Sequence, residues 1–66
     1  MSIAKTIEIT ASSAQGFDDA IKQGIAKANE SLENITGAWV MDQEMNVKDG
    51  KITDYTVRMK LTFVLK

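Results

Sequence analysis

The segment ITDYTVRMKLTFVLK, residues Ile52 to Lys66, carries the clearest structural signal in this sequence. Its apolar and polar residues alternate, as they do along a β-strand whose successive side chains point to opposite faces. The apolar positions are Tyr55, Val57, Met59, Leu61, Phe63 and Leu65, and the polar ones are Thr56, Arg58, Lys60, Thr62 and Lys66. At ~3.3 Å per residue such a strand spans about 40 Å or more, which is longer than one helix covers. The pattern therefore predicts a long strand that meets other subunits as well as its own helix.

A tight turn precedes this strand at Lys48-Asp49-Gly50-Lys51. The Asp-Gly pair supplies the positive φ angles that two-residue hairpin turns need. The turn connects the last strand to a second predicted strand, Ala38 to Val47, which has apolar residues on both faces. We expect either that both faces of this strand are covered or that a β-bulge exchanges its faces.

Toward the amino end, a strand pattern and then a helical pattern precede the hairpin. Residues Ile3 to Thr10 alternate as in a strand, and the small and polar residues 11–16 indicate a loop at which a helix starts. From there apolar residues recur at steps of three and four, as on one face of a helix: Phe17, Ile21, Gly24, Ile25, Ala28 and Leu32. Glycine within a helix costs on the order of 1 kcal/mol against alanine, so Gly24 indicates close packing. Residues 34–37 are expected to end the helix.

These elements predict an α+β fold in the order β-α-β-β, with a three-stranded antiparallel sheet partly wrapped around one helix. Residues 1–66 form a single domain in this interpretation. A domain of this size buries too little apolar surface to be comfortably stable alone. The sequence has no Cys for a disulfide and no His for a transition-metal site. Oligomerisation is the main remaining means of stabilisation, so we expect a homo-oligomer.

Composition and charge disfavour several classes of function. Eight Lys and Arg residues against nine Asp and Glu give a net charge of −1, unlike the basic surface of a nucleic-acid-binding protein. No apolar run reaches membrane-spanning length and the first residues lack the apolar region of a signal peptide, so we expect a cytoplasmic protein that does not enter membranes. Without His or Cys, and with no nucleophile-plus-base arrangement, we expect no enzymatic activity.

The order and spacing of the residues resemble those of the dodecin family over nearly the whole chain. The matching segments are KTIEIT (5–10), SS (12–13), FDDAI (17–21), IAKA (25–28), LENI (32–35), DGKI (49–52) and YTV (55–57). Dodecins form hollow homododecamers and are not enzymes, and many of them bind flavins in pairs between Trp side chains of neighbouring subunits. The resemblance therefore implies a non-catalytic binding or storage shell, with FMN, riboflavin or FAD as the ligand class.

Two signature positions of the flavin-binding dodecins differ in this sequence. Their stacking Trp begins the second strand, a position that Gly37 occupies here, and Trp39 lies two residues later. Their flavin-contacting Gln follows a Tyr at the start of the third strand, a position that Thr56 occupies here. The segment VMDQEM, residues 40–45, is more similar to the branch described as calcium-binding dodecins, in which the flavin Trp is also missing.

Four residues are candidates for a flavin site: Gly37, Trp39, Gln43 and Thr56. Strand alternation places Gly37 and Trp39 on one face, and the indole ring offers apolar area and a π face for stacking. The Gln43 amide and the Thr56 hydroxyl can donate and accept hydrogen bonds at the edge of a flavin. The alternative is that Trp39 fills a subunit interface or a channel wall and that Gln43 and Thr56 are solvated strand residues.

Asp42 and Glu44 are the candidate calcium ligands, because alternation places both carboxylates on one face. Calcium takes six to eight oxygen ligands, so more than one subunit would have to supply them. The alternative is that these carboxylates pair with Arg58 and Lys60 across the strands. A structural shell that binds no specific ligand is the third interpretation.

Overall fold

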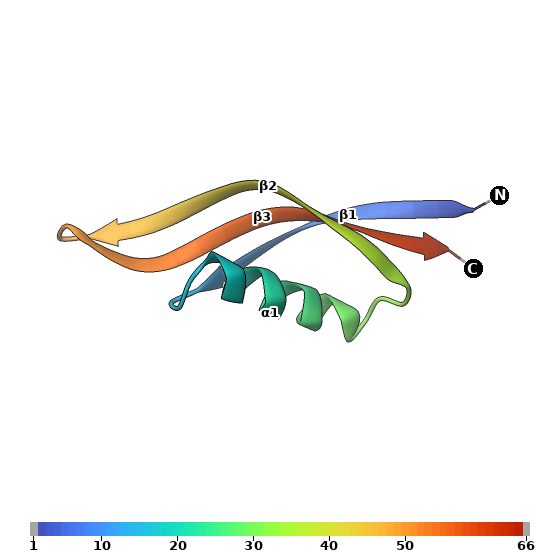
Figure 1. The fold of residues 1–66 in the computed structure, drawn as a ribbon, viewed down its shortest axis with the longest axis horizontal. Coiled ribbons are helices and arrows are strands. Elements are labelled where there is room, and N and C mark those ends of the chain that lie inside the picture. The colour runs from blue at the N-terminus through green and yellow to red at the C-terminus, as the bar shows by residue number, and fades with distance from the viewer. Residues whose placement is uncertain (1, 66) are drawn as a thin grey trace.

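The computed structural model describes residues 2–65 and contains four elements in the predicted order. They are β1 (Ile3–Ser13), α1 (Phe17–Asn29), β2 (Ile35–Lys48) and β3 (Lys51–Leu65). The strands form one antiparallel sheet in the order β1-β3-β2, so the strongly alternating strand lies in the centre. The subunit is elongated, 52 × 20 × 13 Å, with α1 lying along one side of the sheet (Figure 1). The predicted β-α-β-β fold is confirmed.

The predicted element boundaries need three corrections. Residues 11–13, expected in a loop, continue β1 because they pair with residues 55–57 of β3. The helix ends at Asn29, before the predicted stripe residue Leu32, and β2 begins at Ile35 and not at Ala38. Asn34 adopts a φ of 63° immediately before β2, a left-handed conformation that Asn tolerates better than most residues. The last position predicted for the final strand, residue 66, lies outside the described residues.

The side of the sheet that packs on α1, here called the helix face, contains the core. Its fully buried members are Ala20, Val57, Met59 and Leu61. Partly buried apolar residues from the other elements pack around them, namely Ile7, Ile9, Ala11, Phe17, Ile21, Ile25, Ala28 and Ile35. The opposite side, here called the open face, carries the even-numbered polar residues of β3 from Thr56 to Thr62, and no helix of the described chain covers it (Figure 1).

Gly24 allows α1 to approach the sheet closely. It is buried, and a Cβ atom built on it would lie 2.6 Å from Met59 Cε and 3.0 Å from Ala11 Cβ. Real Cβ atoms essentially never lie as close as the first of these contacts, and the second is tighter than most, because atoms at such distances repel each other. The close packing predicted from this glycine is confirmed.

β2 is the strand that the helix of its own subunit leaves uncovered. α1 packs mainly on β1 and β3, and every residue of β2 except Ile35 is exposed. The hairpin of β2 and β3 extends past the start of α1 as a two-stranded arm (Figure 1). The exposed large apolar residues of β2 are Trp39, Val40, Met41, Met45 and Val47. Within one subunit, therefore, neither face of this strand is covered beyond Ile35.

The described residues contain no helix that is long and apolar enough to cross a membrane.

Candidate functional site

A β-bulge in β2 decides which of the candidate residues share a face of the sheet. Gly37 pairs with Thr62 and Trp39 with Lys60, whereas Asp42, after the bulge, pairs with Arg58. Cα partners in an antiparallel ladder project to the same side. Gly37, Trp39, Asp42 and Glu44 therefore all lie on the open face, and the bulge offered as an alternative for this strand is confirmed.

The same bulge places Gln43 on the helix face. Gln43 pairs with Val57, whose side chain is in the core. Plain alternation along 39, 41 and 43 would set Gln43 beside Trp39, but the extra residue Met41 reverses the direction of the side chains that follow it. Gln43 and Trp39 of one subunit therefore cannot contact the same side of one ligand.

Thr56 lies on the open face but is separated from Trp39. It is only 7% exposed, and its Oγ1 lies 2.9 Å from Ser12 Oγ. Asn46 Nδ2 also donates a hydrogen bond to this oxygen, at 3.3 Å, and another to Asp54. Thr56 is four residues along β3 from Lys60, the partner of Trp39, which corresponds to about 13 Å of strand. The hydroxyl is thus held by its neighbours and lies away from the indole ring.

Trp39 is the most exposed aromatic side chain on the open face. It is 66% exposed, and the Nζ atom of Lys60 lies 5.6 Å from the centroid of its ring. This distance is within the range of a cation–π interaction. Beside it, a Cβ atom on Gly37 would meet only Thr62 Cβ, at 4.0 Å. The absence of a side chain at position 37 leaves the surface next to the indole open.

Asp42 and Glu44 hold Arg58 between them. Nη1 of Arg58 donates to Asp42 Oδ1 at 2.8 Å, and Nη2 donates to Glu44 Oε1 at 3.2 Å. These hydrogen bonds, the one to Asp42 first, raise the pKa of the Arg58 guanidinium above its ordinary value, so it stays charged. The expected pairing with Arg58 is confirmed. Lys60, the other expected partner, makes no ion pair with these carboxylates and lies over Trp39 instead.

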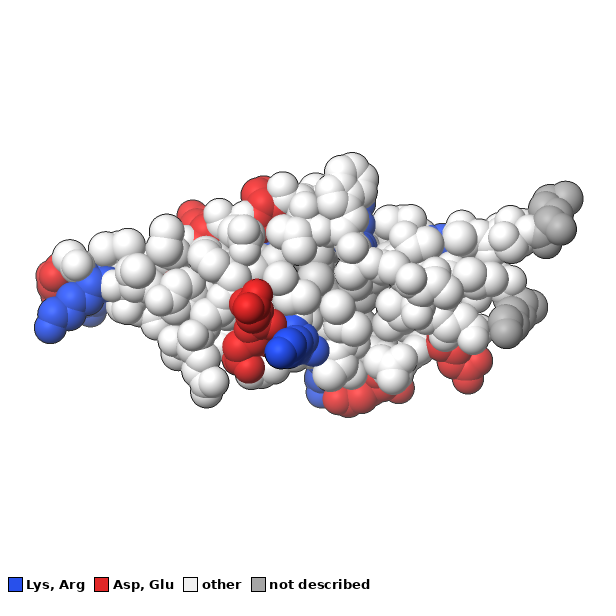
Figure 2. Space-filling model, viewed as in Figure 1, with Lys and Arg blue, Asp and Glu red and all other residues white. Residues whose placement is uncertain are grey.

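The carboxylates of one described subunit do not form a metal site by themselves. Among residues 2–65, no group of three or more Asp and Glu side chains is placed to hold a metal ion. Charged side chains on the side seen in Figure 2 lie in small separate groups of both signs, with uncharged surface between them. A calcium ion at Asp42 and Glu44 would have to displace Arg58 and draw further oxygens from outside the subunit.

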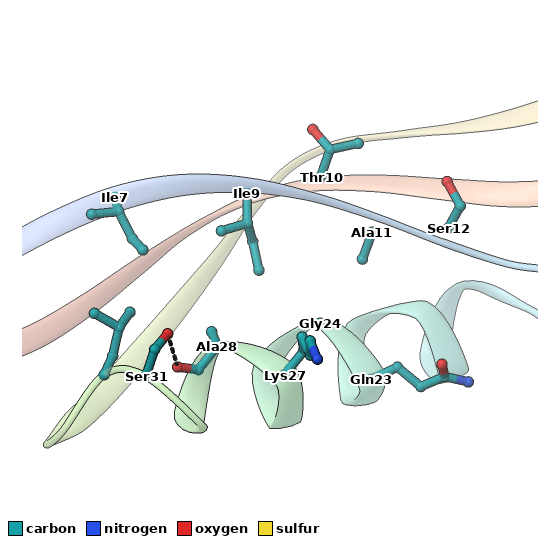
Figure 3. A pocket seen from close by; sticks show the side chains of 11 residues that line it. Ile7, Ile9, Thr10, Ala11, Ser12, Gln23, Gly24, Lys27, Ala28 and Ser31 are labelled. Carbon is teal, nitrogen blue, oxygen red and sulfur yellow. Dashed lines mark hydrogen bonds between the residues drawn. The ribbon is translucent and has the colours of Figure 1, made fainter.

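A hollow lies on the helix face, away from the candidate residues. It has a volume of about 550 Å³ and runs between β1 and the edge of α1. Figure 3 shows Ile7, Ile9 and Ala11 pointing from β1 toward the helix, while Thr10 and Ser12 point away from it. Neither Trp39 nor the two carboxylates line this hollow.

Lys60 is a further residue at the aromatic position, and the amino-acid sequence alone did not place it there. Its pairing with Trp39 follows from the β2–β3 register, and the register depends on the bulge. Alternation by itself gave no reason to prefer Trp39 over Asp42 or Glu44 as its neighbour.

Comparisons with known proteins agree on one family. The model of the family described as Dodecin matches residues 3–66. Calcium dodecin from Mycobacterium tuberculosis is 31% identical over 67 residues, an alignment that covers 100% of this chain and 93% of that protein.

Solved structures show the same likeness. A dodecin from Streptomyces davaonensis superposes with a TM-score of 0.93 at 31% identity, covering 98% of this chain and 96% of that one. The calcium-chelating immunodominant antigen calcium dodecin of M. tuberculosis, described as having a novel calcium-binding site, superposes with a TM-score of 0.84 at 29% identity, covering 98% and 93%. A dodecin variant from Thermus thermophilus has the same fold, with a TM-score of 0.94 at 21% identity and coverage of 100% and 98%.

Proposed function

The chain belongs to the dodecin family, and from this membership we propose that it is the subunit of a non-catalytic, ligand-binding homododecamer. The uncovered strand β2 supports self-assembly, because a short chain that leaves so much apolar surface in water gains stability when copies of it pack together. Eight large apolar residues are exposed among the described residues: Ile3, Trp39, Val40, Met41, Met45, Val47, Ile52 and Leu65.

Light scattering tests the assembly directly. We expect multi-angle light scattering on the purified protein at micromolar concentration to give the mass of twelve chains, with no change on tenfold dilution. The apolar area left on one subunit is the reason for expecting a stable assembly. A monomer at these concentrations would contradict the proposal.

The ligand that the open face supports best is a planar aromatic molecule of the flavin class, stacked on Trp39. The observation that carries this proposal is the 66% exposure of Trp39 beside Gly37, where no side chain fills the adjacent surface. An exposed indole next to free space offers a large apolar π face to a ring. Gln43 is not part of this proposed contact because it lies on the helix face, and Thr56 is not part of it because its hydroxyl is bonded to Ser12 and Asn46.

A riboflavin titration tests the stacking role of Trp39. We expect addition of protein to quench riboflavin fluorescence and to saturate at a simple ratio per chain. Trp39→Ala should weaken binding by about 1–3 kcal/mol, the range measured for ring stacking on aromatic side chains. Met45→Ala is the matched control, since Met45 is an exposed apolar residue of the same strand but pairs with Tyr55 on the helix face. Equal affinities for both variants would place the ligand elsewhere.

Calcium is the second candidate ligand, and two observations favour it. A relative that is 31% identical over its length is a calcium dodecin, and Asp42 and Glu44 point to the same face and are both linked to Arg58. Since Arg58 lies between the two carboxylates, a cation that binds them must compete with its guanidinium.

Titration calorimetry with calcium separates the two candidates. We expect Arg58→Met to raise the affinity for calcium because it frees both carboxylates, and Asp42→Asn to lower it. Lys60→Met is the matched control, as it removes one positive charge from the same face without freeing either carboxylate. If Arg58→Met and Lys60→Met change the affinity equally, the ion responds to net charge and does not bind between Asp42 and Glu44. No heat with calcium and no quenching with riboflavin would favour a structural shell.

A further inference from the structure

Two β-bulges lie on opposite strands of the β2–β3 hairpin and offset each other. The first leaves Met41 of β2 without a Cα partner in the described sheet, and the second leaves Thr53 of β3 without one. The five residue pairs between the bulges, here called the shifted window, are displaced by one position. Residues 41–46 of β2 lie opposite residues 53–58 of β3, six on each strand. A plain ladder without bulges could therefore pair the same residues and leave the hairpin turn and the flanking pairs unchanged.

In that plain ladder, the β2 side chains of the shifted window would lie on the opposite face, because a slip of one residue exchanges the two faces of a strand. Asp42 would pair with Val57, which is buried in the core, whereas in this structure Gln43 does. Met45 would turn from the helix face to the open face. The two bulges therefore decide which face of the arm is apolar and on which face its carboxylates lie.

Neither the backbone nor the apolar residues of β2 favour the bulged register. Each bulge leaves one residue out of the hydrogen-bonded pairing of the strands, so the backbone by itself favours the plain ladder. The exposed apolar side chains do not decide either, because β2 carries them on both faces, and register is weakly specified in such a strand. The bulged register must therefore be selected by polar side chains.

Asn46 contacts the second bulge through both its side chain and its backbone. Its Nδ2 donates hydrogen bonds to Asp54 and, at 3.3 Å, to Thr56 Oγ1. Thr56 is buried, and its hydroxyl lies 2.9 Å from Ser12 Oγ, so the contacts of Asn46 extend to β1. The carbonyl of Asn46 accepts a hydrogen bond from Oγ1 of the bulged residue Thr53, at 3.1 Å. In the plain ladder the Asn46 side chain would lie on the helix face and lose these partners on the open face.

Arg58 holds the shifted window near the first bulge, where it forms ion pairs with Asp42 and Glu44. All three side chains are more than one third exposed, and ion pairs in water contribute little individually. The hydrogen bonds of Asn46 reach a buried hydroxyl and the bulge itself. We therefore assign the larger part of the selection to Asn46.

We propose that Asn46 selects the bulged register of the hairpin, so that without its side chain the shifted window slips by one residue into the plain ladder. Asn46 is a positioning residue in this proposal, since it fixes the face on which other side chains lie. A single polar residue sets the alignment of apolar elements in coiled coils in a similar way. The inference goes beyond the proposed assembly and ligands, because it concerns the surface that β2 presents whichever ligand binds.

Deletion of Met41 separates the selection of register from ordinary hydrogen bonding. Without Met41, the observed pairs of the shifted window follow directly from the pairs before them, so this register no longer needs the first bulge. The test therefore compares Asn46→Val in the complete chain with Asn46→Val in a chain that lacks Met41, as a double-mutant cycle. Valine removes the amide and keeps a high strand propensity.

A disulfide reports the register, because the sequence contains no Cys. Met45→Cys and Tyr55→Cys together place two thiols on Cα partners, which lie within disulfide reach. In the plain ladder the same two residues would lie on opposite faces. We expect the cross-link to form in the otherwise unchanged chain and to be lost with Asn46→Val. It should return when Met41 is deleted as well, and titration of free thiols measures each case.

Gln43→Val is the matched control, since it removes an amide from the same strand at a position on the helix face, and it should keep the cross-link. A cross-link that persists in Asn46→Val would overturn the proposal. So would a cross-link that is lost both with and without Met41, because Asn46 would then stabilise the hairpin without selecting its register. If Asn46→Val does not fold in the complete chain, circular dichroism of the chain lacking Met41 decides: restored folding supports the proposal, and an unfolded chain overturns it.

Discussion

Shortening Leu61 to alanine should lower the free energy of unfolding by about 2–5 kcal/mol. Leu61 is fully buried in the central strand, where it pairs with Ile7 on one side and Ala38 on the other. The truncation removes apolar contacts and leaves a cavity that the two flanking strands hold open, because their backbones stay paired to β3. In a chain of this length, such a loss is a large part of the total stability. Urea unfolding followed by circular dichroism measures it.

Leu65→Ala is the matched control for Leu61→Ala. It removes the same atoms from the same strand and the same face of the sheet. The side chain of Leu65, however, is 49% exposed. Within the subunit its cost should be below about 1 kcal/mol. Both variants should be unfolded at one protein concentration, because the stability of an assembly depends on concentration. An equal cost would show that a neighbouring subunit covers Leu65, whereas a small cost for Leu61→Ala would show that Leu61 is not tightly packed in the core.

Replacing Gly24 with valine should destabilise the fold by roughly 3 kcal/mol or more, the upper end for overpacking a well-packed core. The first added carbon would already lie 2.6 Å from Met59 Cε and 3.0 Å from Ala11 Cβ. The Met59 methyl ends a flexible side chain and can turn away. Ala11 Cβ is fixed to the backbone of β1, so relief requires α1 to move off the sheet, which loosens the contacts of the helix with the whole core.

Ala26→Val controls for a β-branched side chain placed in this helix outside the core. Ala26 is on the exposed side of the same helix, two residues from Gly24, so valine there pays the propensity difference of less than about 0.7 kcal/mol without entering the core. The thermal unfolding midpoint of Gly24→Val should therefore lie well below that of Ala26→Val. If Gly24→Val and Ala26→Val unfold at the same temperature, Gly24 is not needed for the close approach of helix and sheet.

The register of β3 gives the two basic residues in the middle of the open face different surroundings. Lys60 and Arg58 are two residues apart, yet one lies over an aromatic ring and the other between two carboxylates. A flavin-class ligand at the first region and a cation at the second would use different side chains. The riboflavin and calcium titrations therefore report on separate parts of one surface, and each has variants that leave the other region intact.

The elements whose signals are local were predictable from the amino-acid sequence. Alternation along β3 identified the central strand and its buried side, since side chains on a strand must alternate whatever lies next to them. The Asp49-Gly50 pair identified the hairpin, and both residues adopt positive φ angles, 54° and 76°, as a two-residue hairpin turn requires. The spacing of apolar residues identified the helix that begins at Phe17. Gly24 indicated where this helix packs closely on the sheet. Family resemblance over nearly the whole chain followed from the order of these same segments.

Several features of this fold were decided only by the tertiary structure, because they depend on pairing between residues that are distant in the sequence. The small residues 11–13 were predicted to form a loop. They belong to β1 because residues 55–57 of β3 supply their backbone hydrogen-bond partners. The extra residue Met41 moved Gln43 away from Trp39. Apolar residues on both faces of β2 allowed for a bulge, but they did not give its position. Lys60 lies with Trp39, and Arg58 with Asp42 and Glu44, because that bulge sets the register on which cross-strand neighbours depend. The candidate site is thus a property of strand register, and register is fixed by contacts across the sheet and not by the residues of one strand.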